Sequence, residues 1–260
     1  MKFIHITDTH LVEAGALLYE LDPLDRLERC IASINRDHGD AEFAIITGDL
    51  AHSGRLPAYH ALKGALGRLR LKTWLMLGNH DKREHFLQVF PDSPRDADGF
   101  IQYTFDIPIG RCICLDTNHP EVPWGLLCEK RLAWLKAELA RAGDMPVYLF
   151  MHHPPFAVGI KRMDENSLRE PGRFAAVIAG SRNIRHLFFG HLHRPVGGSW
   201  RGIPVTTMRG TNHQVALDFV LEGRTPGSHE PPAYAVVLAD ADQTVVHFHD
   251  YLDGSKRFLL

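Results

Sequence analysis

The amino-acid sequence predicts an α/β fold built around a parallel sheet. Three short apolar segments, at residues 3–6, 44–47 and 74–77, have the pattern of buried strands. The two segments between them, at 24–34 and 57–69, carry apolar residues at spacings of three and four, which is the pattern of an amphipathic helix. This β-α-β-α-β order predicts parallel strands that are joined by right-handed crossovers.

Each of these two helices has its own apolar stripe. Pro57 lies in the first turn of the second helix, where proline is favoured because its missing N–H would have no partner there. The stripe of the first helix consists of Leu24, Leu27, Ile31 and Ile34, and that of the second consists of Tyr59, Leu62, Leu66 and Leu69.

The middle of the chain predicts a second group of strands. Residues 102–107 and 111–115 have the pattern of a hairpin that turns at 108–110. A helix is predicted over 129–141, followed by a buried strand at 147–151.

The last third of the chain changes from a mixed pattern to a β pattern. The polar stretch 157–171 shows no clear period, and we interpret it as a loop that covers a site. A helix is predicted to begin at 174, and a strand is predicted at 186–189. From residue 205 onward the pattern is all β, with strands at 205–208, 233–239 and 244–249.

Composition and charge exclude several classes of protein. The formal net charge of −2 provides no strong field that would attract nucleic acid or an anionic membrane. No apolar run approaches the roughly 20 residues that span a bilayer, and a strand is predicted where a signal peptide would stand. The four cysteines lie in apolar or helical contexts. We therefore expect a cytoplasmic protein with reduced cysteines.

Polar residues follow five of the predicted strands, and histidine is frequent among them. Because open α/β sheets place their ligands at the carboxyl ends of strands, we expect these residues to meet at one edge. Asp8 and His10 are two residues apart, so on extended backbone they would face the same side. The residues are Asp8 and His10, Asp49, Asn79 and His80, His152, and His191 and His193.

This set of side chains is typical of a site for two transition metals. Imidazole suits Zn, Mn, Fe or Ni, and carboxylate suits the harder ions of that group. A carboxylate can bridge two ions, because each of its oxygens can bind one of them. The alternative is that each residue is an ordinary turn or strand cap. That alternative gives no reason for so many histidines and aspartates at one sheet edge.

In order along the chain, these motifs resemble those of the calcineurin-like metallophosphoesterases. The resemblance covers residues 3–194. Within that family the chain is most similar to the small bacterial branch of class III cyclic nucleotide phosphodiesterases and glycerophosphodiesterases, because of the segments 151–155 and 211–214 and the short length. The motifs are Asp8-x-His10, Gly48-Asp49, Gly78-Asn79-His80-Asp81, His152 and Gly190-His191-x-His193.

The resemblance implies a fold and a domain organisation. It implies an α/β two-sheet β-sandwich flanked by helices, with the catalytic domain at residues 1–200. Residues 201–260 would form a β extension that completes the sandwich, provides a pocket wall and offers a dimer surface. A homodimer or a higher homo-oligomer is expected.

The resemblance also implies residue roles. His80 would donate to a phosphoryl oxygen or to the leaving group, Asn79 and His213 would lie near the substrate, and Asp81 would orient its neighbours. His152 would be a ligand, while His153 would brace the loop; the residues alone do not rank these two. Asp8, His10, Asp49 and His193 would hold one metal, and Asp49, Asn79, His152 and His191 would hold the other.

The implied activity is hydrolysis of a small phosphodiester, such as a 3′,5′- or 2′,3′-cyclic nucleotide or a glycerophosphodiester. A metal-bound hydroxide would attack phosphorus in line, with Asp49 and His80 in the catalytic set. Two divalent ions are expected, Fe, Mn or Zn, with Co a further candidate in vitro. No nucleic acid polymer and no membrane is expected as a partner. The alternatives are a phosphomonoesterase, a nuclease and a non-catalytic metal-binding scaffold.

Four cations lie in or next to the predicted covering loop, and they allow two interpretations. They would contact a second phosphate of the substrate, or they would be ordinary solvated surface charges, which is the commoner case. These residues are Lys161, Arg162, Arg169 and Arg173.

Overall fold

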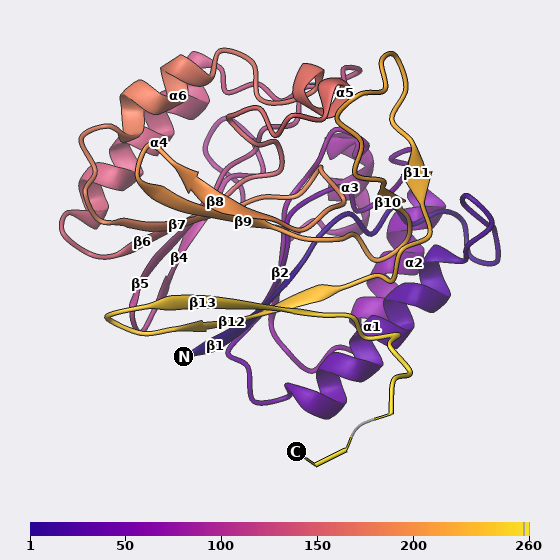
Figure 1. The fold of residues 1–260 in the computed structure, drawn as a ribbon. Helices are drawn as coiled ribbons and strands as arrows, with labels where there is room; N and C mark the ends of the chain where they lie inside the picture. The colour runs from indigo at the N-terminus through magenta and orange to yellow at the C-terminus, as the bar shows by residue number, and fades with distance from the viewer. Residues whose placement is uncertain (257, 260) are drawn as a thin grey trace.

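Two β-sheets lie face to face, with helices on their outer sides, in the computed structural model of this chain (Figure 1). The structure describes residues 1–256 and 258–259. The α/β two-sheet sandwich flanked by helices is therefore confirmed.

The first sheet contains the three parallel strands that the sequence predicts. Its order is β13-β12-β1-β2-β3. β1 pairs in parallel with β2, and β2 with β3, whereas β12 runs antiparallel to both β1 and β13. The strands are β1 (Lys2–Ile6), β2 (Ala44–Ile46), β3 (Thr73–Leu75), β12 (Tyr234–Ala239) and β13 (Thr244–His249).

The second sheet has the order β4-β5-β6-β7-β9-β8. The predicted hairpin is present as β4 and β5, which run antiparallel. β8 is not predicted by the sequence pattern, because its glycines give it no apolar alternation. The strands are β4 (Tyr103–Ile107), β5 (Gly110–Cys114), β6 (Val147–Phe150), β7 (Ile184–Phe188), β8 (Val196–Trp200) and β9 (Ile203–Thr207).

Helices cover the outer faces of both sheets. α1 and α2 lie outside the first sheet, and α4 and α6 lie outside the second (Figure 1). α6 begins at Pro171, so the prediction that this helix begins at residue 174 is wrong; proline suits the first turn. The helices are α1 (Pro23–Asp37), α2 (Leu56–Leu66), α3 (Arg83–Val89), α4 (Glu129–Ala142), α5 (Lys161–Glu165) and α6 (Pro171–Ile178).

Aromatic rings fill the space between the two sheets. The ring of Phe3 on β1 stacks on Phe43 at 4.8 Å between centroids, and it meets Phe188 of β7 edge-on at 5.6 Å. Phe150 on β6 stacks on Phe188 at 5.0 Å. All four rings are buried. Such packing fixes the two sheets relative to each other, and with them the loops at their ends.

The last 56 residues contribute to both sheets and to a small hairpin. β12 and β13 extend the first sheet, while β10 (Gln214–Val215) pairs with β11 (Gly227–Ser228) beside the mouth of the site. Residues 257 and 260 of the predicted extension lie outside the described residues. Within the described part of the chain, no helix is long and apolar enough to cross a membrane.

Candidate metal centre

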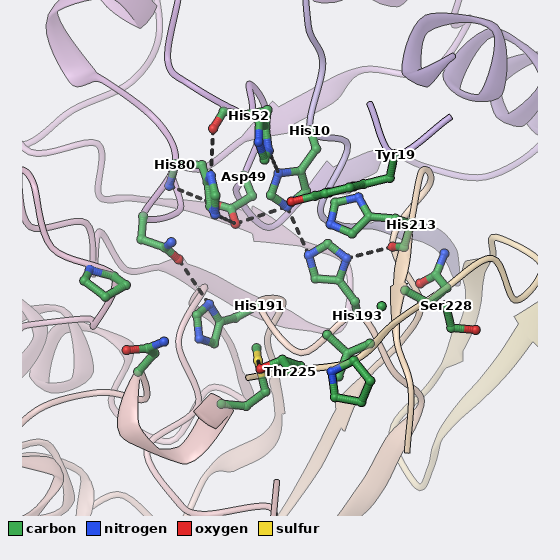
Figure 2. Close-up of a pocket in the computed structure, with 18 of the residues that line it drawn as sticks. His10, Tyr19, Asp49, His52, His80, His191, His193, His213, Thr225 and Ser228 are labelled. Atoms are coloured by element: carbon green, nitrogen blue, oxygen red, sulfur yellow. Dashed lines mark hydrogen bonds and ion pairs between the residues drawn. The ribbon is translucent and has the colours of Figure 1, made fainter. Parts of the chain in front are cut away.

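The candidate residues come from both sheets and gather at one place, where most of them line a pocket (Figure 2), while Asp8 and His152 are fully buried and do not line it. Loops after β1, β2 and β3 carry Asp8, His10, Asp49, Asn79 and His80. Loops after β6 and β7 carry His152, His191 and His193. Four of them, Asp8, His10, Asp49 and His193, offer ligand atoms that all lie within 4.8 Å of one another.

The backbone at the candidate ligands is unusual. Asp8 and His10 have φ angles of 52° and 44°, so the prediction that extended backbone aligns their side chains is wrong. Asp49, His191 and His193 also have positive φ, at 51°, 71° and 49°. Side chains with a Cβ rarely adopt this left-handed conformation. Each loop turns sharply at its ligand, and this turn aims the side chain into the pocket.

Two glycines allow the loops to approach one another closely. A Cβ on Gly78 would lie 2.2 Å from Oδ1 of Asp49, and a Cβ on Gly190 would lie 2.2 Å from Oγ1 of Thr7. Neither distance is compatible with a side chain. The glycines in the Gly-Asn-His-Asp and Gly-His-x-His motifs are therefore required by packing.

The first group of donors surrounds His10. Its Nε2 lies 3.3 Å from Oδ2 of Asp49 and 3.0 Å from Nε2 of His193. Nε2 of His193 lies 3.5 Å from Oδ1 of Asp8. The oxygens of Asp8 are held in place, because the backbone N–H of His191 donates to both of them at 3.1 Å.

The second group of donors lies on the other side of Asp49. Nε2 of His152 is 3.4 Å from Oδ2 of Asp49, the same oxygen that faces His10. Nδ1 of His191 is 3.1 Å from the amide oxygen of Asn79. Asp49 is therefore the side chain that the two groups have in common.

Two histidines are oriented by backbone carbonyls. Nδ1 of His152 donates to the carbonyl of Thr47 at 2.8 Å, and Nδ1 of His193 donates to the carbonyl of His213 at 2.8 Å. A carbonyl cannot donate, so each Nδ1 carries a proton, and the neutral ring then has its lone pair on Nε2. In both residues that lone pair points at a carboxylate.

These distances fit metal ligation. A neutral Nε2 and a carboxylate oxygen are both acceptors, so they repel each other unless a cation lies between them. Two atoms that each bind one ion at 2.0–2.2 Å are roughly 2.8–3.6 Å apart, and the pairs described above fall in that range. Nε2 of His152 is also buried and makes no hydrogen bond to the described residues.

The electrostatics of the site favour a cation. Burial alone would lower the pKa of His152, but the Asp49 carboxylate outweighs it and raises that pKa to about 9. Burial alone would raise the pKa of Asp49, yet His152 and His80 hold it well below its usual range. The buried carboxylate thus attracts positive charge strongly, whether this is a proton or a metal ion.

His152 and His153 occupy different environments. Nδ1 of His153 lies 2.8 Å from Oγ1 of Thr117, and its ring packs on Gly125, where a Cβ would be 2.5 Å away. His153 also lies with His152 and His191 in a cluster of three buried imidazoles. It is His152, however, that faces the carboxylate of Asp49.

Asp81 connects the loops that follow β2 and β3. Its carboxylate accepts hydrogen bonds from the backbone N–H groups of Leu50, Ala51 and Gly78 at 2.9–3.0 Å, and from the hydroxyl of Tyr59 at 2.9 Å. The expectation that Asp81 orients its neighbours agrees with these contacts. The loop carrying Asp49 is thereby tied to the loop carrying Asn79 and His80.

Sequence reasoning missed His52. Its Nδ1 lies 3.2 Å from Nδ1 of His10, and its carbonyl accepts from Nδ1 of His80 at 2.7 Å. It thus touches one candidate ligand and one candidate catalytic residue. Its position three residues after Asp49, in the loop at the same strand end, is the signal that would have identified it.

A cavity of about 680 Å³ is lined by the donors His10, Asp49, Asn79, His191 and His193. His80 and His213 line it, together with Tyr19, which the sequence did not single out. Met163 and Asn166, from the segment 157–171, also line it. The prediction that this whole segment is a loop is wrong, because it contains the short helix α5, in which Met163 is buried. The hairpin of β10 and β11 forms one wall.

The cations near the covering loop do not line this cavity. Lys161 pairs with Glu222, and Arg162 pairs with Glu165 at 2.9 Å. Arg173 pairs with both Glu129 and Glu170 at 3.2 Å, and the guanidinium of Arg169 lies over the ring of Trp124. The interpretation as surface charges fits these contacts better than a second phosphate site.

Comparison with known proteins identifies related sequences. A 51% identical relative, named "Probable cyclic nucleotide phosphodiesterase", comes from Rhodopseudomonas palustris; the match covers 100% of this chain and 96% of the relative. A 32% identical relative from Arcobacter nitrofigilis is named "Probable glycerophosphodiester phosphodiesterase GpdQ", with 97% and 93% covered.

A solved structure shows the same fold. It is a dimetal phosphatase from Danio rerio, with a TM-score of 0.73 and 17% sequence identity over 97% of this chain and 96% of the other. The family model described as "Calcineurin-like phosphoesterase" matches residues 1–195. The resemblance inferred from the motifs is thus confirmed, and this chain belongs to the calcineurin-like phosphoesterase family.

Proposed function

We propose that this protein is a phosphodiesterase that uses two divalent metal ions to hydrolyse small organic phosphodiesters. The observation that carries the proposal is the position of Asp49. Its Oδ2 lies 3.3 Å from Nε2 of His10 and 3.4 Å from Nε2 of His152, as a ligand shared between two ions does. Relatives named for cyclic nucleotide and glycerophosphodiester hydrolysis support these two substrate classes.

The two donor groups define the proposed metal ligands. When bound, the ions would polarise the phosphoryl oxygens and activate a water for in-line attack. We assign Asp8, His10, Asp49 and His193 to one ion, and Asp49, Asn79, His152 and His191 to the other.

We propose that His80 contacts the substrate. Its Nδ1 donates to the carbonyl of His52, which fixes the orientation of the ring. Its Nε2 lies 4.0 Å from Oδ2 of Asp49, on the side that lines the cavity (Figure 2). A protonated Nε2 at this place would donate to a phosphoryl oxygen or to the leaving oxygen as charge develops there.

His213 and Asn79 complete the substrate-binding set. The ring of His213 lies 4.6 Å from that of His193 and 4.9 Å from that of His10, so it covers the first donor group on its open side. The amide of Asn79 lines the cavity between His80 and His191. Both side chains would contact the phosphoryl group or the ester arm next to it.

The charge of the cavity favours diesters over monoesters. Among the described residues that line it, none is a lysine or an arginine. A phosphomonoester carries up to two negative charges near neutral pH, whereas a diester carries one. Positive charge in this cavity would come only from the metal ions and the imidazoles. A singly charged diester needs less positive charge to balance it than a doubly charged monoester does.

The metal identities, assembly and location are also proposed. The imidazole and carboxylate donors favour Mn, Fe or Zn, with Co a further candidate.

We propose a homodimer that forms through the edge strand β13. Three apolar side chains on or beside this strand, Leu238, Val245 and Phe248, are each more than a third exposed. Sedimentation analysis measures the assembly. The four unpaired cysteines support a cytoplasmic location.

The function is tested with bis(p-nitrophenyl) phosphate and the Mn²⁺-loaded protein. We expect wild-type hydrolysis, and a fall of at least 10³-fold in kcat for Asp49→Ala, because both donor groups lose their shared ligand. Asp25→Ala, on the exposed side of α1, is the matched control and retains activity. Unchanged turnover in Asp49→Ala, or a metal-loaded wild type that hydrolyses no phosphoester, would refute the proposal.

A further inference from the structure

The turn before α1 has an unexpected composition. The N–H of Leu18 donates to the carbonyl of Leu21 at 2.8 Å, and the N–H of Leu21 donates back at 3.2 Å. The two residues between them, Tyr19 and Glu20, have φ angles of 53° and 68°. A turn with two positive φ angles favours Asn-Gly, because most side chains are strained in that conformation. Here the strained position carries a large aromatic ring.

The ring of Tyr19 is not part of the hydrophobic core. It is 57% exposed, and its hydroxyl makes no hydrogen bond to the described part of the chain. Its contacts are with pocket histidines: it meets the ring of His213 at 4.6 Å and that of His52 at 6.0 Å, both edge-to-face. Core packing therefore gives no reason for an aromatic residue here.

Tyr19 lies at the mouth of the cavity. Figure 2 shows its ring beside His213, with the hydroxyl directed toward the side where His10 and Asp49 lie. The turn is tied to the loop that carries His213, because the Asn212 side chain donates to the carbonyl of Leu18 at 3.3 Å. The ring is thus held at a fixed place beside the donors while much of its surface stays open.

Among the described residues that line the rest of the cavity there is no lysine, arginine or carboxylate. This lining consists of Pro123, Met163, Val215, Thr225 and Pro226, together with the polar Asn166, Gln214, Ser228 and His229. The nearby cations are paired outside it, as described above. An ester arm in this space finds a mixture of apolar and polar side chains, together with the exposed ring of Tyr19. That environment suits a flat, uncharged group such as a nucleobase.

We propose that Tyr19 is a specificity residue whose ring packs against the base of a nucleotide substrate. The proposal rests on the phosphodiesterase function and deepens it: substrates with a nucleoside arm are favoured over those with a glycerol arm. Tyr19 takes no part in the chemical step. Its removal raises KM more for nucleotide substrates than for glycerophosphodiesters, and it changes kcat for the two classes by the same factor.

The direct test compares two ligands that differ only in the base. Binding of adenosine 5′-monophosphate and of ribose 5-phosphate to the Mn²⁺-loaded protein is measured by calorimetry. We expect the wild type to bind the nucleotide about tenfold more tightly, as stacking of one base gives. Tyr19→Gly removes the ring and relieves the turn, and it lowers this ratio to about one. Tyr19→Phe keeps an aromatic ring at this position, so we expect the wild-type ratio of affinities. Glu20→Gly changes the same turn but keeps Tyr19, and it is therefore the matched control.

Three results would overturn the proposal. They are a wild type that does not prefer the nucleotide, a Tyr19→Gly protein that still prefers it, and a Tyr19→Gly protein that binds both ligands equally more weakly. The last result would mean that Tyr19 only braces the metal site. A kinetic panel with 3′,5′-cyclic AMP and glycerophosphoethanolamine tests the proposed function separately. A wild type that hydrolyses neither substrate refutes that function, while the ratio of the two binding constants can still be measured.

Discussion

At the scale of single residues, the site depends on conformations that a sequence pattern does not reveal. Five candidate ligands have positive φ angles, namely Asp8, His10, Asp49, His191 and His193. Such positions cost about 1–3 kcal/mol each, and they persist only where the surroundings impose them. The sequence predicts these residue types and their meeting place. It does not predict the left-handed turns, because asparagine or glycine would be the expected residues there.

Asp81 is expected to control the site without touching the substrate. Replacing it by asparagine puts an amide NH₂ where a carboxylate oxygen accepts hydrogen bonds. Ala51 N–H then loses its acceptor if the NH₂ replaces Oδ1, and Leu50 and Gly78 N–H lose theirs if it replaces Oδ2. For Asp81→Asn we expect 10–100-fold weaker Mn²⁺ binding by calorimetry and a loss of about 1–3 kcal/mol of unfolding free energy.

Tyr59→Phe is the graded control for this prediction, because it removes one of the four hydrogen bonds to Asp81, together with the bond that Lys82 N–H donates to the Tyr59 hydroxyl. We expect a smaller loss of about 1 kcal/mol. Equal Mn²⁺ affinity in wild type and Asp81→Asn would contradict the assignment of Asp81 as an orienting residue.

At the scale of elements, the strands that the sequence predicts are those with an apolar run or a clear alternation of apolar and polar residues. β2 and β6 are buried along their whole length, and β1 and β7 are buried at all but one position each, so apolar residues predominate in these four strands. β8 has exposed glycines at its centre, and β10 and β11 have two residues each. Such short or exposed strands are specified by their partners in the sheet, and a local pattern cannot identify them.

Two buried histidines in the strands form hydrogen bonds with threonine hydroxyls. His5 on β1 donates to or accepts from Oγ1 of Thr47 at 2.8 Å, and His186 on β7 pairs in the same way with Oγ1 of Thr206. Burial and the charge of His186 lower the pKa of His5 to about 3, and burial lowers that of His186 to about 4. Neither ring is among the candidate metal ligands.

These histidines predict acid lability. Their pKa values in the folded protein lie below the value of about 6.5 in an unfolded chain, so the unfolded chain binds more protons at intermediate pH. The stability that the neutral rings contribute is complete above about pH 6.5 and is lost as the pH falls toward 4. For His186→Phe we expect the slope of unfolding free energy against pH to decrease by up to about 1.4 kcal/mol per pH unit, the effect of one proton.

Denaturant titrations from pH 7 to pH 4.5, with chelator present, measure these slopes. In the metal-free proteins the candidate metal ligands give the same pH dependence of stability in wild type and variant. Their contribution therefore cancels when the two slopes are compared. Parallel stability curves for the two proteins would show that His186 is protonated equally in its folded and unfolded states.

At the scale of the whole molecule, the fold class and the family are predictable from the sequence, and the shape of the pocket mouth is not. The five strand-end motifs lie in the first 193 residues and define the donors. Tyr19 and the β11 strand lie beside those donors because of the tertiary fold, and no local pattern in their sequences places them there. His52 and His213 differ, because each lies close in sequence to a motif that the chain does show.

Removal of the metals is expected to destabilise the whole protein. Without cations, buried acceptors face one another in both donor groups, and the strained ligand conformations are less well supported. An ion present at 100 times its Kd contributes about 2.7 kcal/mol. For two ions in a chain of this size, we expect chelation to lower Tm by roughly 10 °C or more.

Calorimetric scans with and without EDTA measure this shift, with Mn²⁺ added back to test reversal. Asp49→Ala is the control, because a protein without the shared ligand should respond much less to either treatment. Identical Tm values for the chelated and Mn²⁺-loaded wild type would contradict the prediction.

The donors are divided between the two layers of the sandwich: the loops of the first sheet supply Asp8, His10, Asp49 and Asn79, and those of the second supply His152, His191 and His193. A nascent chain whose layers have not yet closed together holds only half of the constellation. Each donor group draws on both layers, so neither group is complete until the two sheets have packed together.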